Sequence, residues 1–164
     1  MKTKEMAIAA VLAALAILIP YFSITLPIPP FTATFASHVA VIIAMFVSPW
    51  VAMLAAIGSA VGFWLKGLGP DVFARAMTHV IFAVSGAYMI KYLVKKTYHI
   101  VFVAAITGIL HALAEAIIVL PFGGKYTLAV AFGIVGVGTL IHHCIDFVIA
   151  LVIVVPLRKQ RFLR

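Results

Sequence analysis

Acidic residues and cysteine are scarce in this chain, and each shortage excludes a class of protein. Only 4 of 164 residues are Asp or Glu, against 12 Lys and Arg, and apolar types make up 66% of the sequence. A soluble domain of this length would need a much more charged surface. The single cysteine, Cys144, excludes an internal disulfide. The sequence therefore describes a protein whose surroundings are mostly lipid.

Two catalytic motifs are also missing. The chain contains no phosphate-binding loop of the type Gly-x-x-x-x-Gly-Lys-Ser/Thr, so it has no ATPase site of its own. It contains no Gly-x-Ser-x-Gly, so serine-based catalysis lacks support. Any uphill transport would depend on partners or on ion gradients.

Long apolar runs separated by short charged clusters predict an all-α integral membrane protein, a bundle of six transmembrane helices. A bilayer core needs about 20 apolar residues per helix. The first run follows Met1–Glu5 and leads into an equally apolar chain, so it is interpreted as a retained helix rather than a signal peptide. Residues 1–164 are expected to form one transmembrane domain. The helices are expected at roughly 6–22, 34–48, 50–66, 71–94, 99–120 and 127–155.

Lysine and arginine are unevenly divided between the two expected faces of the membrane. One face has only Lys66 and Lys125, with Arg75 just inside the fourth span. Because Lys and Arg accumulate in cytoplasmic loops, the asymmetry predicts that both termini are cytoplasmic. The basic residues flank the spans, which argues against nucleic-acid binding. The cytoplasmic group consists of Lys2, Lys4, Lys91, Lys95, Lys96, Arg158, Lys159, Arg161 and Arg164.

Proline marks the connection after the first helix. Prolines 27, 29 and 30 exclude a regular helix, so residues 24–31 are expected to form a stiff, extended outer loop. Further along, Ser48-Pro49-Trp50 predicts a tight turn, and Asp71 is expected to cap the fourth helix.

Polar side chains at membrane depth are the candidates for function. Arg75 and His79 are four residues apart, on one face of the fourth helix. A buried arginine needs an anionic partner or water, and three outcomes stay open. Arg75 contacts a ligand, pairs with Glu115 or Asp71, or extends its charged end to the outer interface.

The remaining polar groups lie in three other spans. His38 is near the outer end of the second helix, and His111 and Glu115 share a face of the fifth. His142 and Asp146 share a face of the sixth. His111-Ala-Leu-Ala-Glu115 lacks the second histidine of a zincin motif, and there is no cysteine cluster, so no metal or other cofactor is expected. One alternative stays open, an intramembrane metal-dependent enzyme that uses His111, Glu115, His142 and Asp146.

Small residues recur at the spacing that lets helices approach closely in lipid. The first helix contains Ala9-x-x-x-Ala13 and Ala10-x-x-x-Ala14, and the third contains Gly58-x-x-x-Gly62. Internal packing explains the glycine pair. The alanines of the first helix are more numerous than one internal contact requires, so part of that surface is a candidate for docking another membrane protein.

Together these features resemble the S components of energy-coupling factor (ECF) transporters. The shared features are a basic N-terminus, six expected helices in a short chain, an alanine-rich first helix and no ATPase motif. The resemblance implies a subunit of the prokaryotic plasma membrane that binds a vitamin or metal from outside. It further implies association with a T subunit and two ATPases, followed by toppling in the membrane to release the substrate. Ala9, Ala10, Ala13 and Ala14 would form the docking surface.

Two stretches narrow the resemblance. The sequences Thr32-Ala33-Thr34-Phe35-Ala36-Ser37-His38 and Phe73-Ala74-Arg75-Ala76-Met77-Thr78-His79 are similar to niacin-specific S components. Nickel- and cobalt-type relatives begin Met-His, whereas this chain begins Met1-Lys2-Thr3, which lowers the expectation of a metal substrate. Pyridoxine, hydroxymethylpyrimidine, pantothenate and a queuosine precursor remain alternatives.

The resemblance implies a role for each candidate residue. Arg75 would pair with the carboxylate of nicotinate, and the loop from Leu26 to Phe31 would close over the ligand. The other expected members of the substrate site are His79, His38, Glu115, His111, His142 and Phe35. A rival from another class is a small self-sufficient channel or ion-coupled carrier, although the internal repeat usual for such carriers is not visible.

Overall fold

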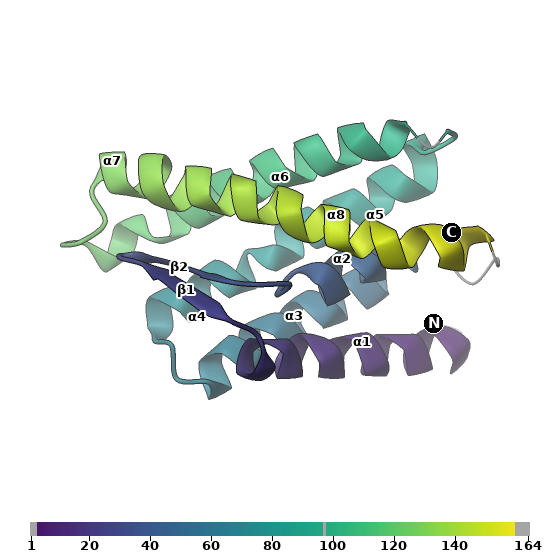
Figure 1. Cartoon of the computed structure of the whole chain (residues 1–164), viewed down its shortest axis with the longest axis horizontal. Helices are drawn as coiled ribbons and strands as arrows, with labels where there is room; N and C mark the ends of the chain where they lie inside the picture. Colours follow the sequence, from purple (N-terminus) through teal and green to yellow (C-terminus); the bar gives the residue numbers. More distant parts are fainter. Residues whose placement is uncertain (1–2, 97, 160–164) are drawn as a thin grey trace.

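The computed structural model describes residues 3–96 and 98–159, which form a bundle of helices with one small hairpin (Figure 1). Most helices run along the long axis of the molecule (Figure 1). The elements are α1 Thr3–Phe22, β1 Thr25–Ile28, β2 Phe31–Thr34, α2 Val39–Met45, α3 Pro49–Leu65, α4 Pro70–Met77, α5 His79–Leu93, α6 His99–Ile118, a 3-10 turn Leu120–Phe122, α7 Leu128–Val130, a π-helical turn Ala131–Gly136, and α8 Val137–Lys159.

Apolar helices confirm the prediction of a helical membrane protein. Among the described residues, four helical stretches are long and apolar enough to cross a bilayer. α3 is a shorter apolar helix of 17 residues, and α2 has only 7. The four stretches are Thr3–Phe22, Pro70–Leu93, His99–Phe122 and Leu128–Lys159.

The proline-rich segment is more regular than expected. Residues 25–34 form an antiparallel hairpin in which Thr25 lies opposite Thr34 and Ile28 opposite Phe31. The peptide bond between the two residues of the turn, Pro29 and Pro30, is cis. Prolines are tolerated here because the strands are edges of a two-stranded sheet and leave some amide positions unpaired. Since the hairpin takes residues that were expected to begin the second helix at 34, that helix starts only at Val39.

The predicted helix over 71–94 is interrupted at Thr78. The Thr78 hydroxyl donates to the carbonyl oxygen of Arg75 at 2.6 Å, and the Thr78 amide donates to the same oxygen at 3.0 Å. These short-range bonds tighten the chain and separate α4 from α5. Asp71 is not the cap that the sequence predicted, because Gly69 holds that position and Asp71 lies in the first turn of α4.

Helix packing centres on α3, which contacts α1, α2, α4 and α5. A Cβ at Gly58 would lie 2.9 Å from the carbonyl oxygen of Ala13, and one at Gly62 would lie 2.6 Å from that of Ile17. The glycines therefore let the backbones of α1 and α3 touch, which is the internal packing expected for this pair.

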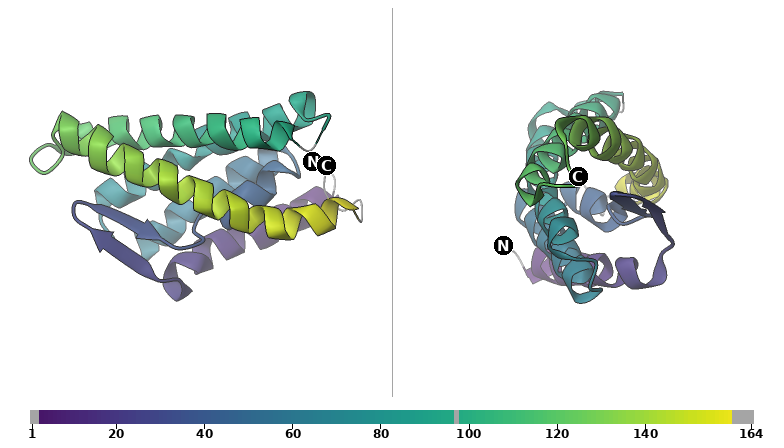
Figure 2. Two further views of the ribbon diagram at one scale, coloured as in Figure 1. Left: turned by 45° about the horizontal axis from the view of Figure 1, so that its top comes forward. Right: turned by 90° about the vertical axis from the view of Figure 1, so that its left-hand side faces the viewer.

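The two ends of the bundle differ in character. α1 begins and α8 ends at one end, where the connection between α5 and α6 also lies (Figures 1 and 2). Lys95 and Lys96 there line one surface hollow with Arg158 and Lys159. The hairpin and the loop from α3 to α4 occupy the opposite end (Figure 1). Of the predicted cytoplasmic group, Lys2, Arg161 and Arg164 lie outside the described residues.

Candidate functional site

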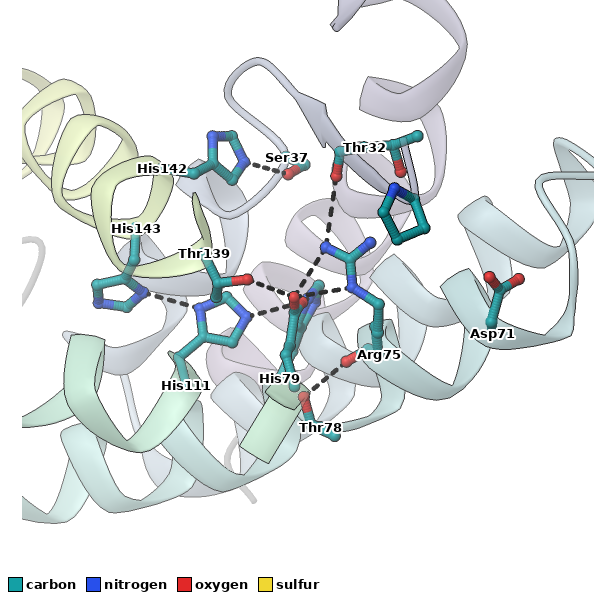
Figure 3. Close-up of polar contacts among 12 residues, drawn as sticks. Thr32, Ser37, Asp71, Arg75, Thr78, His79, His111, Thr139, His142 and His143 are labelled. Carbon is teal, nitrogen blue, oxygen red and sulfur yellow. Dashed lines mark hydrogen bonds and ion pairs between the residues drawn. The ribbon is translucent and has the colours of Figure 1, made fainter. Parts of the chain in front are cut away.

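A cluster of buried polar side chains lies inside the bundle, next to the hairpin (Figure 3). The segments that supply it are far apart in the sequence: the turn after β2, α3, α4, the start of α5, the middle and end of α6 and the first half of α8. Polar groups buried among apolar helices must satisfy one another, so this concentration marks a site rather than ordinary packing. The buried members include Ser37, His38, Ser59, Arg75, His79, Thr107, His111, Glu115, Thr139, His143 and Asp146.

The central contact is an ion pair between α4 and α6. The Arg75 Nε donates to Glu115 Oε2 at 2.9 Å, and Nη2 of the same guanidinium lies 2.8 Å from that oxygen. The Arg75 side chain is 7% exposed, so its charge does not reach the interface. Of the three outcomes that the sequence left open, the structure shows the pair with Glu115.

The rest of the Glu115 carboxylate is also held. Thr139 of α8 donates its hydroxyl to Oε2 at 2.5 Å (Figure 3). Oε1 lies 3.2 Å from Nε2 of His111 and 3.6 Å from Nε2 of His79. One carboxylate oxygen thus faces a cation and a hydroxyl, while the other faces two imidazoles.

Asp146 of α8 fixes the turn that leads from the hairpin into α2. Its Oδ1 accepts the amide of Ala36 at 3.0 Å, and its Oδ2 accepts the amide of His38 at 2.9 Å. Ala36 has a φ of 60°, a left-handed conformation that is costly for alanine, so these bonds hold a strained turn in place. Oδ2 also lies 3.0 Å from Nδ1 of the His38 ring.

The hairpin covers this cluster. The Phe31 ring lies under the Arg75 guanidinium, 4.6 Å from its carbon, and the Thr32 carbonyl accepts from Arg75 Nη2 at 3.4 Å. The Phe31 ring also lies against Gly138 at the start of α8, because a Cβ at that glycine would come within 2.8 Å of it. The loop of residues 26–31, expected to close over a ligand, thus belongs to a hairpin that already covers the site.

A second ion pair lies at the rim, near the turn of the hairpin. Lys125 donates to Asp71 at 2.8 Å, and Tyr126 donates to the same carboxylate at 2.6 Å. The bond to Asp71 raises the pKa of Lys125, and burial raises the pKa of Tyr126. Both groups therefore keep their protons and remain donors at neutral pH. The Tyr126 hydroxyl also lies 3.3 Å from the carbonyl of Pro30, which ties this rim to the hairpin.

Between the hairpin and the helices lies a cavity of about 20 Å³. That volume holds about one water molecule, which is too little for a vitamin. Its walls contain one ion pair, Arg75 with Glu115, together with hydroxyl groups, imidazole rings and apolar side chains. The cavity is lined by Thr32, Thr34, Ser37, His38, Phe63, Val72, Arg75, Ala76, His79, Glu115, Thr139 and His142.

The structure brings most of the predicted site residues together. Arg75, His79, His38, Glu115 and His142 line the cavity, and His111 lies behind it against Glu115. Phe35 is different, because its side chain is 53% exposed and does not line the cavity. It occupies the turn between β2 and α2.

The four alanines of α1 divide between two faces. Ala9 is buried, and Ala13 is half-buried against Gly58 of α3. Ala10 and Ala14 are exposed, beside exposed apolar residues such as Val11. Only the second Ala-x-x-x-Ala pair is therefore available on the outer surface of the described chain.

Several residues of the site were not among the predicted substrate contacts. Asp146 entered only the rival metal set, and Thr139 and Phe31 were not singled out as contacts. A signal for two of them exists in the sequence, because Thr139, His143 and Asp146 recur at helical spacing and are all buried on one face of α8. The rival set does not form one group, since His111 and Glu115 gather with His79, whereas His142 and Asp146 gather with His38.

Comparison with known proteins gives one informative relative. The niacin transporter NiaX of Lactococcus lactis subsp. cremoris (strain MG1363) is 35% identical to this chain, over an alignment that covers 92% of the chain and 72% of the relative. The chain belongs to the NiaX family. No family model and no solved structure matches it.

Membership of the NiaX family confirms the resemblance to niacin-type S components that the sequence indicated. It also fits the long apolar helices, so the chain is a multi-pass protein of the plasma membrane. A transporter family agrees with the expectation that the protein is not an enzyme.

Proposed function

We propose that this chain is the substrate-binding S component of an ECF-type importer and that it captures niacin, as nicotinate, from outside the cell. In this proposal the bundle spans the membrane six times with both termini in the cytoplasm. The hairpin faces outward, and a T subunit with two ATPases supplies the energy. The relative named for niacin transport and the chemistry of the buried cavity support this assignment.

The observation that carries the proposal is the environment of Arg75. The guanidinium is buried, lines the cavity and uses Nε and Nη2 on Glu115. Its Nη1 makes no hydrogen bond to another described residue. A buried donor without a partner is costly, and a carboxylate is the acceptor that an arginine binds most strongly. Nicotinate would offer its carboxylate to this nitrogen, with its flat ring near the histidines and Phe63.

Binding would require the hairpin to move. A pyridine ring with a carboxylate is far larger than the water-sized cavity. The hairpin is tied to the bundle by a few polar contacts, among them Arg75 to Thr32 and Lys66 to Thr25 at 3.1 Å. Displacing β2 outward would widen the cavity next to Arg75. Its return over the ligand would exclude water and strengthen the charge pair.

Coupling to the energising partners would use the outer face of α1. Ala10 and Ala14 are small and exposed. They lie on α1, where only 22% of the residues in the apolar stretch are buried. Small residues at this spacing allow close approach of another membrane helix. Ala9 and Ala13 would support this face from within, since Ala9 is buried and Ala13 lies against Gly58 of α3.

The experiment is equilibrium binding of nicotinate, nicotinamide, pyridoxine and pantothenate to the purified chain in detergent, without ATP. Saturable, preferential binding of nicotinate supports the proposal. Preferential binding of another vitamin would keep the S-component assignment and reject niacin. Binding of none of them would reject niacin as the substrate.

A further inference from the structure

We propose that His38, His79, His111 and Glu115 form a binding site for a divalent transition-metal ion of the zinc type. This inference goes beyond niacin capture and would hold whichever vitamin the cavity accepts. It also revises the expectation, based on spacing within single helices, that the chain holds no metal. The three histidines come from the turn before α2, from the start of α5 and from α6.

The nitrogens of the three histidines form one close group, and Glu115 contacts two of them. Nε2 of His38 lies 3.3 Å from Nε2 of His79. Glu115 Oε1 lies 3.6 Å from Nε2 of His79 and 3.2 Å from Nε2 of His111. Each of the three histidines offers one nitrogen within 4.8 Å of those of the other two.

These separations fit a tetrahedral ion. Metal–ligand bonds of about 2.0–2.2 Å in a tetrahedron place neighbouring ligand atoms roughly 3.4 Å apart. The three separations given above, between 3.2 and 3.6 Å, bracket that value. The rings of His38, His79 and His111 also meet edge to face, at interplanar angles of 81°, 83° and 90°, so each presents a nitrogen without stacking on its neighbours.

The other nitrogen of each ring has its own contact. Nδ1 of His79 lies 3.2 Å from the Ser59 hydroxyl, and Nδ1 of His111 lies 3.2 Å from Nδ1 of His143. Nδ1 of His38 faces Oδ2 of Asp146 at 3.0 Å. Metal-binding histidines are oriented in this manner, and a carboxylate behind the imidazole is a common arrangement.

Charge also favours a cation here. The buried cluster contains two carboxylates, Glu115 and Asp146, and one arginine, Arg75. Arg75 pairs with Glu115, whereas the described partners of Asp146 are main-chain amides and imidazole rings. A divalent ion on His38 would supply positive charge next to Asp146, where an uncompensated carboxylate in a low-dielectric interior is costly.

The donor set selects the class of ion. Three imidazoles and one carboxylate suit zinc, cobalt, nickel or copper, whereas magnesium and calcium prefer sites made entirely of oxygen. Zinc accepts four ligands of this kind without a preference imposed by its d electrons. Cobalt(II) reports the geometry of the same site through its visible spectrum.

The test uses the full chain, purified with a tag that contains no histidine, stripped with a chelator and re-equilibrated with Zn²⁺. We expect close to one tightly held zinc per chain by mass spectrometry of the metal content. Substituted Co²⁺ should give the intense visible absorption of a four-coordinate ion. Substoichiometric zinc in the wild-type chain, or the weak spectrum of six-coordinate Co²⁺, would overturn the site without recourse to any variant.

Variants then assign the ligands. His111→Gln and His38→Gln should each weaken zinc binding by more than about tenfold. His99→Gln is the matched control, because His99 lies at the connection of α5 and α6, outside the cluster, and its loss should leave zinc binding unchanged. An equal loss in His99→Gln would overturn the assignment. Nicotinate binding on the same samples is a separate readout: nicotinate without zinc rejects the metal site alone, and zinc without nicotinate rejects the proposed niacin function alone.

Discussion

Arg75 and Glu115, which are 40 positions apart in the chain, form an ion pair at 2.8 Å in which neither side chain is more than 7% exposed. Both charged groups are buried, and the desolvation penalty of burying them can exceed the energy of their attraction. What it secures is orientation: the guanidinium is held at the cavity with Nη1 still available. The pair is thus better explained by recognition of an anion than by stability.

Breaking this pair should destabilise the protein strongly. Glu115→Ala leaves a buried arginine without a counter-charge, and we expect a loss of about 3–5 kcal/mol in the free energy of unfolding. The double variant Arg75→Met/Glu115→Gln removes both charges and should recover most of that loss. Unfolding in a denaturing detergent measures both effects.

The rim pair provides the control for that experiment. Lys125 has a side chain that is 57% exposed, so Lys125→Ala breaks an ion pair that water and salt already weaken. We expect a loss below about 1 kcal/mol. Comparable losses in Lys125→Ala and Glu115→Ala would contradict the distinction between a buried and a rim pair.

Gly62→Ala should destabilise the contact between α1 and α3. In a helix, alanine is normally favoured over glycine by about 1 kcal/mol. Here its Cβ would meet the backbone of Ile17 at 2.6 Å, which cannot rotate away, so we expect a net loss of roughly 1–3 kcal/mol. Gly133→Ala, where a Cβ meets nothing within 4 Å, should be neutral or stabilising. Thermal unfolding of the two variants side by side checks the sign, and a neutral Gly62→Ala would be inconsistent with backbone contact.

Ala10→Trp should separate transport from binding. A bulky side chain on the exposed face of α1 would block close approach of a partner helix while leaving the distant cavity intact. We expect vitamin uptake by cells to fall at least tenfold and vitamin binding in detergent to be unchanged. Val148→Trp is the matched control on α8, where Val148 is 64% exposed. Equal loss of uptake in both variants would indicate a general effect on membrane insertion instead of a docking surface.

Asp146→Ala should loosen the turn that follows the hairpin. The carboxylate accepts two amide bonds, and one of them holds Ala36 in its left-handed conformation. Without these bonds, the amides of residues 35–38 should exchange with deuterium at least tenfold faster, since a buried bond of this kind contributes about 1.5–3 kcal/mol. Exchange in α3 should change little, which provides an internal control. Unaltered exchange at residues 35–38 would show that Asp146 does not hold the turn.

The features that the sequence predicted well are those governed by local rules. The turn expected at Ser48-Pro49-Trp50 leads directly into α3, which begins at Pro49. The structure adds that the Ser48 hydroxyl accepts the amide of Val51 and caps this helix. The break at Thr78 was not predicted, because the segment has no proline or glycine there to mark it. The hairpin was not predicted, because prolines usually argue against β-strands. That it covers the buried cluster is visible only from the contacts of Phe31 and Thr32 with Arg75.

The candidate site was foreseen as a set of residues but not as an arrangement. Arg75, Glu115 and the histidines could be predicted because ionisable side chains within membrane-spanning segments are energetically unfavourable and are therefore usually functional. Their pairing depends on which helix faces share the interior, and no spacing within one helix contains that information. His38 and His79 were expected in one site, but for this reason their direct contact, between residues 41 positions apart, was not predicted. It is also why Ala9 and Ala10 could not be assigned to different faces of the bundle before α3 was placed.

The central claim is that Arg75 recognises the carboxylate of nicotinate in the cavity beneath the hairpin. Calorimetric titration of nicotinate and nicotinamide into the wild-type chain and into Arg75→Met/Glu115→Gln tests it most directly, because the double variant keeps the interior free of an unpaired charge. We predict that nicotinate binding weakens by roughly 10- to 100-fold in the variant, whereas binding of the neutral amide changes much less. Equal losses for both vitamins, or nicotinate binding that is unaffected, would contradict the account.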